Sequence, residues 1–280
     1  MSFQSWLKQE RLLSSGKVPF FSWFVSRRPR AWLEPAVLTA LALVPFGAVW
    51  WQPFLLSYAI LILGLAVSLT AWWTWERGAS FLGWLAWLFM LTLYWSSSFL
   101  FWLFLETTLV RIFLLVAVVA VAWWYLVDWR QHRYALSVSQ RGGGQLSSVA
   151  VGFISALALG SAAQGLIVFL DAPLWLLLLG CYLPLVLSFI SLVYINGWSV
   201  RQAWIYYLTS AAVLLQVFIV STWWPTSLYA VGFVMATVYA ALGLALRQEA
   251  QGFINRRSFS RELLILAVAL SVVLATAPWY

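Results

Sequence analysis

The stretch FLGWLAWLFMLTLYWSSSFLFWLFLETTLVRIFLLVAVVAVAWWYLV, residues 81–127, decides the fold class of this chain. Its only charged side chains are Glu106 and Arg111, which stand five positions apart near the middle. A helix needs about 20 predominantly apolar residues to cross the hydrocarbon core of a membrane. The stretch therefore predicts two membrane spans, over about 81–105 and 109–127, joined by a tight turn.

The whole chain has the same character. Of its 280 residues 64% are hydrophobic and 9% are charged, and the mean hydropathy is +0.91. Soluble domains carry roughly 25% charged residues, so this chain lacks the side chains for a soluble surface. We expect an all-α, polytopic transmembrane helical bundle, integral to the membrane and without a soluble domain.

Seven further apolar stretches bring the expected number of spans to about nine. They cover about 35–50, 53–75, 147–169, 174–194, 203–222, 226–246 and 263–278. Residues 1–33 mix basic and aromatic side chains, which predicts an interfacial amphipathic segment ahead of a transmembrane domain over 34–280. Recurring Arg-Gln pairs allow two repeated halves, 34–127 and 147–247, followed by a last helix over 263–278. An arginine at an inner helix end is expected without any repeat.

The positions of Lys and Arg predict the orientation. With the N-terminus inside and the spans alternating, only Arg111 of the 16 Lys and Arg residues falls outside. Cytoplasmic loops carry this excess of positive residues. We therefore expect a bacterial-type cytoplasmic membrane, with the N-terminus inside and the C-terminus outside.

The 21 tryptophans are expected mainly at the two membrane surfaces. Four Trp-Trp pairs fall at predicted helix ends, where the amphipathic indole ring is most stable. Trp95 is the main exception, near the middle of its span. A cage of aromatic rings around a cationic ligand is the alternative.

The sequence contains few residues for catalysis. The single histidine, His132, stands in an expected inner loop, and the single cysteine, Cys181, in a span. Haem needs axial ligands such as histidine, and zinc needs three or four clustered His, Cys or carboxylate ligands. We expect no catalytic residue, no metal and no cofactor. A lipid-modifying enzyme stays possible only through the inner cluster of Asp128, Arg130, His132 and Arg133.

Polar residues gather in the outer half of the predicted bundle. They are Ser97, Glu106, Arg111, Gln164 and Gln216. An unsatisfied polar group in hydrocarbon costs several kcal/mol. Two interpretations remain: hydrogen bonds that join helices, worth roughly 0.6–2 kcal/mol each, or an outward-facing ligand pocket built from these five residues.

Small residues recur at helical spacing in two spans. Gly160 and Gly165 stand in the fifth, and Gly232 and Ala236 in the eighth. Such faces let helix backbones approach closely. They fit packing inside the chain or assembly with another subunit.

These observations favour a non-catalytic subunit or scaffold of a membrane assembly. The alternative is a transporter or flippase of an apolar or amphipathic small molecule or lipid, which would need few charged contacts. The expected partners are membrane lipids and a protein partner or second copy. The basic residues lie beside apolar spans and form no stripe on a soluble module, so nucleic acid is not an expected partner.

Overall fold

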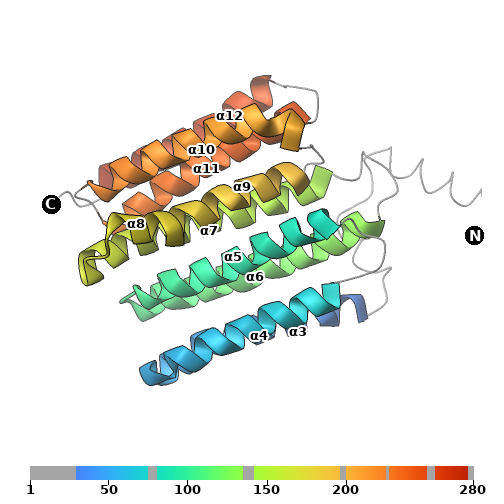
Figure 1. The fold of residues 1–280 in the computed structure, drawn as a ribbon, viewed down its shortest axis with the longest axis vertical. Helices are drawn as coiled ribbons and strands as arrows, with labels where there is room; N and C mark the ends of the chain where they lie inside the picture. The colour runs from blue at the N-terminus through green and yellow to red at the C-terminus, as the bar shows by residue number, and fades with distance from the viewer. Residues whose placement is uncertain are drawn as a thin grey trace, which may run out of the picture. The chain divides into compact units, whose positions relative to one another are not determined.

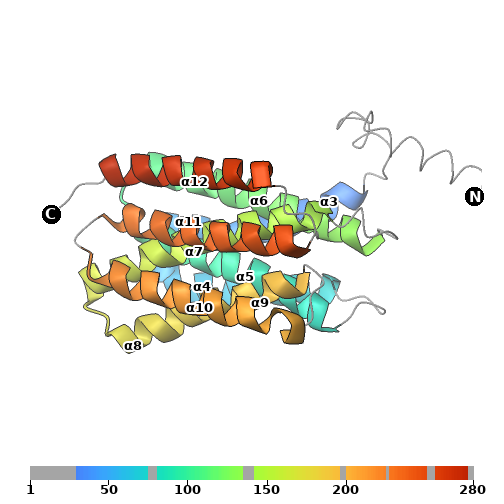
Figure 2. The same cartoon turned by 90° about the horizontal axis from the view of Figure 1, so that it is seen from above.

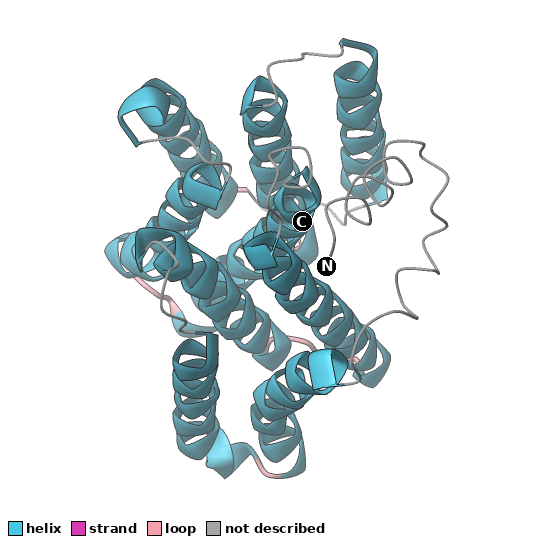
Figure 3. Ribbon diagram, turned by 90° about the vertical axis from the view of Figure 1, so that its right-hand side faces the viewer, coloured by secondary structure: helices cyan, strands magenta, loops and turns pink. Residues whose placement is uncertain are grey.

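The structure is a computed structural model that describes residues 30–74, 81–134, 142–195, 200–224, 227–250 and 256–276. Every regular element in these ranges is a helix and none is a strand (Figure 3). The chain divides into two compact units, Met1–Val37 and Leu38–Tyr280. All helix contacts reported below lie within the second unit. Of the interfacial segment expected over 1–33, residues 1–29 lie outside the described residues, and Arg30 begins the first described helix.

Helices occur at all of the predicted span positions. They are α3 (Arg30–Trp51), the 3-10 turn η1 (Pro53–Leu55), α4 (Leu56–Thr74), α5 (Phe81–Leu103), α6 (Thr108–Tyr134), α7 (Gly142–Leu170), α8 (Leu174–Leu177), the π-helical turn η3 (Leu178–Tyr182), α9 (Leu183–Ile195), α10 (Val200–Thr222), α11 (Leu228–Ala250) and α12 (Arg256–Thr276). The wide turn η3 lies just before Pro184, which has no N–H and whose ring clashes with the carbonyl four residues earlier.

Six of these helices are long and apolar enough to cross a membrane. Their apolar parts are Phe81–Leu103, Thr108–Trp129, Ser147–Leu170, Leu174–Ile195, Trp204–Thr222 and Leu228–Leu246. Shorter apolar helical stretches occupy Pro35–Trp51, Leu56–Trp72 and Leu264–Ala275. The all-helical class is confirmed, and spanning length is shown for six of the predicted spans.

The segment between α6 and α7 is shorter than the loop expected over about 128–146. Helix α6 continues to Tyr134, and α7 already begins at Gly142. The Arg and Gln residues that follow Asp128 have high helix propensity, so the end of the apolar run does not end the helix. The interpretation of His132 as a loop residue was therefore wrong, because its backbone belongs to α6.

Helix α7 is central to the packing of the second unit. It contacts α5, α6, α9 and α11, whereas α12 packs against α11 and α4 against α5. Figure 1 shows this order, with α4 on one side, α7 and α9 in the middle and α10 to α12 on the other, and Figure 2 shows it from above. One hydrophobic cluster joins α3 to α7, and a second joins α5 and α7 to α8 through α11.

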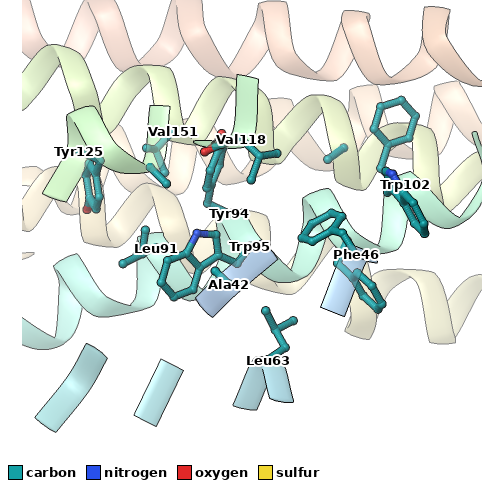
Figure 4. Close-up of a cluster of buried hydrophobic side chains, with 14 of the residues drawn as sticks. Ala42, Phe46, Leu63, Leu91, Tyr94, Trp95, Trp102, Val118, Tyr125 and Val151 are labelled. Carbon is teal, nitrogen blue, oxygen red and sulfur yellow. Dashed lines mark hydrogen bonds between the residues drawn. The ribbon is translucent and has the colours of Figure 1, made fainter. Parts of the chain in front are cut away.

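Two tryptophans are buried in the first cluster, Trp95 near the middle of α5 and Trp102 near its C-terminal end. Trp95 is 0% exposed and Trp102 is 2% exposed. Figure 4 shows Trp95 among Ala42, Leu91 and Tyr94, whose hydroxyl donates to the carbonyl oxygen of Ala117 at 3.2 Å. By contrast, the exposed tryptophans include several at helix ends. They are Trp51, Trp72 and Trp223.

Candidate functional site

The small-residue faces of α7 and α11 pack against each other inside the chain. A Cβ atom added to Gly160 would lie 2.9 Å from the Cα of Gly232. One added to Gly232 would lie 2.0 Å from the Oγ of Ser161 and 2.4 Å from a backbone oxygen. Only glycine permits this approach, so the seam between α7 and α11 is closed to any other helix.

The other two packing candidates are also used within the chain. A Cβ atom on Gly165 would lie 2.8 Å from the ring of Phe104, which follows α5. Ala236 is 0% exposed in the second hydrophobic cluster. All four small residues therefore contribute to internal packing.

Arg111 binds the end of α5 rather than Glu106. Its Nε donates to the carbonyl oxygen of Leu105 at 2.7 Å, and its guanidinium lies 5.0 Å from the ring centroid of Trp102. A cation at a helix C-terminus satisfies free carbonyls and interacts favourably with the helix dipole. Glu106 is exposed, and no ion pair joins it to Arg111, both of which the structure describes.

Ser97 and Gln164 are buried on neighbouring helices. Ser97 on α5 donates its hydroxyl to the carbonyl oxygen of Tyr94 at 3.2 Å. Gln164 on α7 is 7% exposed, and its Oε1 has no hydrogen-bond partner among the residues that the structure describes.

Gln216 points the opposite way from Gln164. It is exposed on α10, whereas Leu214 and Phe218 on the same helix are buried. The two glutamines were expected at similar depth, but one side chain faces the interior of the bundle and the other faces outward. The structure therefore does not gather the five polar candidates around one cavity.

Nine positions between 204 and 220 on α10 are exposed. Five of them stand at alternating steps of four and three residues along the helix, and they are Ile205, Thr209, Ala212, Gln216 and Ile219. Within the part of the chain that the structure describes, Gln216 makes no hydrogen bond. We call these five positions the α10 stripe.

Exposed hydroxyls on other helices differ from Gln216. Ser68 on α4 donates to the carbonyl oxygen of Gly64 at 2.9 Å, and Ser271 on α12 donates to that of Ala267 at 2.8 Å. A hydroxyl can thus be satisfied by its own helix. Gln216 is an exposed amide whose donors and acceptor are available to another molecule.

Within the described ranges, the buried polar side-chain atoms without a hydrogen-bond partner come from α5 and α7. They are Gln164 Oε1, Trp95 Nε1, Ser98 Oγ, Trp102 Nε1 and Ser161 Oγ. Of these residues, only Gln164 was a predicted pocket residue. Trp95 and Trp102 belong to the cluster that includes α3, whereas Ser161 faces Gly232 on α11. These atoms therefore lie on different sides of the central helices and form no single site.

A buried carboxylate joins α6 to α7 near the other end of the bundle. Asp128 is 6% exposed and accepts a hydrogen bond from the Oγ of Ser147 at 2.5 Å. One turn earlier on α6, Tyr125 donates to the carbonyl oxygen of Trp87 at 3.3 Å and is hydrogen bonded to Ser148. In the sequence, the Ser147-Ser148 pair at the start of an apolar run was the feature from which these buried hydrogen bonds could have been predicted. The side chain of His132 lies outside the described residues.

A small pocket lies between α4, α5 and α6. Its volume is about 20 Å³, and it is lined by Thr70, Trp84, Trp87, Leu88, Leu91, Tyr125, Leu126 and Trp129. That volume holds about one water molecule, whereas ligand sites typically measure about 300–1,000 Å³. No group of three or more His, Cys, Asp or Glu suited to a metal occurs in the described ranges.

Comparison with known proteins finds no protein-family model, no curated protein and no solved structure that matches the chain. The function is therefore inferred from the residues and their geometry. The α10 stripe with Gln216 is the candidate functional site.

Proposed function

We propose that this chain is a non-catalytic subunit or scaffold of a membrane assembly and that the α10 stripe is a docking surface for another membrane helix. The observation that carries the proposal is the exposed amide of Gln216 within the apolar helix Trp204–Thr222. In hydrocarbon an unpaired amide costs several kcal/mol. A helix from another polypeptide that offers a hydrogen bond at this depth removes that cost.

The topology belongs to the same proposal. We place nine spans in a bacterial-type cytoplasmic membrane, with the shorter apolar parts of α3, α4 and α12 completing the set. The distribution of Lys and Arg supports an N-terminus inside and a C-terminus outside. A reporter active only in the cytoplasm, fused after Tyr280, should be inactive. An active reporter would contradict this orientation.

A transporter or flippase of an apolar or amphipathic molecule is the weaker candidate. The pocket between α4, α5 and α6 is more than tenfold smaller than a typical ligand site. Between α7 and α11, the contact of Gly160 with Gly232 leaves no space for a substrate. A subunit needs neither a substrate path nor a ligand cavity. Membrane lipids then surround the exposed apolar faces.

Site-specific photo-crosslinking in intact membranes tests the docking surface. Replacing Ile219 with a benzophenone amino acid places the probe on the α10 stripe, three residues from Gln216. We expect a discrete crosslinked band that contains protein. The matched control is Val268 on α12, which is 54% exposed and whose exposed polar neighbour Ser271 donates its hydroxyl to its own helix. We expect that position to give no protein adduct.

The proposal fails if the probe at position 219 yields no protein adduct, or if both positions yield the same diffuse set of adducts. The crosslinked species should also disappear when Gln216→Leu is added, because the docking interaction is then weakened.

A further inference from the structure

The spacing of the α10 stripe is that of a parallel helix pair. Positions 205, 209, 212, 216 and 219 repeat the alternating steps of four and three residues that place side chains in the seam of a left-handed coiled coil. The inward face of α10 is a separate stripe that packs inside the chain. Its buried residues are Ser210, Leu214, Phe218 and Ser221. Helix α10 thus packs inside the chain through one face, and the α10 stripe lies on its exposed face.

We infer that the helix that docks on the α10 stripe is α10 of a second copy of this chain. This inference rests on the proposed function and names its partner. Two copies in the same membrane orientation are related by a two-fold axis along the membrane normal. Their α10 helices then run parallel, and each residue meets its own counterpart at the same depth.

Gln216 is suited to such a self-pairing. An amide carries both donors and acceptor lone pairs, so the Gln216 side chains of two copies can donate to each other reciprocally. A different membrane protein would have to supply its own polar group at the matching depth. A single polar residue within an otherwise apolar seam also fixes the register of a helix pair.

Ala212 supports the close approach that this pairing needs. It stands four residues before Gln216 on the same stripe and is exposed. Small residues at membrane helix contacts let the backbones approach. The small residues of α7 and α11 cannot serve this purpose, because they are buried in the internal seam.

Co-capture of two differently tagged full-length copies tests the inference. Both copies are expressed together, and the membranes are dispersed into native lipid nanodiscs at a low protein density. We expect the wild-type chain captured by one tag to carry the other tag. Gln216→Leu should lower that fraction by about 3- to 30-fold for each hydrogen bond lost between the two membrane helices.

Two further variants separate dimerisation from folding. Gln216→Asn retains the amide and should preserve most of the co-capture. Gln164→Leu removes the buried amide of α7 and should leave co-capture at the wild-type value. Because Gln216 is exposed, Gln216→Leu should also leave the thermal unfolding of the single chain unchanged.

Either of two results overturns the inference. One is a wild-type chain that is not co-captured. The other is equal co-capture of wild type and Gln216→Leu. A photo-crosslink from position 219 to a different protein would then leave the proposed function in place, whereas the absence of any crosslink would remove both.

Discussion

Gly232→Ala should destabilise the chain strongly although it adds only one methyl group. The new Cβ would meet the backbone oxygen of Leu157 at 2.4 Å, as well as the Oγ of Ser161. A backbone atom cannot move aside cheaply, so α11 must shift away from α7 along their seam. Overpacking of this kind costs about 1–3 kcal/mol and occasionally more. The loss is measured as a lower midpoint of heat-induced aggregation by size-exclusion chromatography in detergent.

Gly64→Ala is the matched control for this prediction. Gly64 also lies inside an apolar helix, but a Cβ atom there has no other atom within 4 Å. Alanine has a higher helix propensity than glycine, so this variant should be as stable as wild type or slightly more stable. Equal midpoints for the two variants would show that the α7–α11 seam is not tight.

Trp102→Ala should have a comparable or larger effect through the loss of a buried side chain. Its ring packs edge-on against Phe46 with centroids 5.8 Å apart, and the Arg111 guanidinium lies over it. Replacing a buried tryptophan by alanine costs about 3–5 kcal/mol. The same aggregation assay should show a lower midpoint and a lower yield of monodisperse protein.

Trp72→Ala is the control that distinguishes the loss of a buried side chain from the loss of any tryptophan. Trp72 is 79% exposed near the end of α4, so its removal leaves no internal cavity and should change the midpoint much less. If the two variants were equally unstable, the loss would come from anchoring at the membrane surface, and the buried role assigned to Trp102 would be wrong.

Helix positions were predictable from the sequence because apolar length is a local property. The turn at Glu106 follows from where the apolar runs end, whereas α7 begins at Gly142, ahead of its apolar part. The ends themselves were less predictable. Helix α6 extends past Asp128 because charged residues with good helix propensity continue it beyond the apolar part.

The rotation of each helix about its axis was not predictable from single spans. Gln164 and Gln216 occupy equivalent depths in their spans, yet one is buried and the other exposed. Rotation depends on which neighbours a helix packs against. The small residues of α7 indicated a close contact, but only the structure shows that the contact is with Gly232 of α11.

Cysteine scanning along α10 tests the central claim most directly. Single cysteines are placed from position 204 to position 220 in a Cys181→Ala background, and disulfide-linked dimers are measured in native membranes after mild oxidation. The account predicts that dimer yield rises and falls with a period of 3.5 residues. The maxima should fall at positions 205, 209, 212, 216 and 219, and the minima at positions 210, 214 and 218. A flat profile, or maxima on the buried face, would contradict pairing of two copies through the α10 stripe.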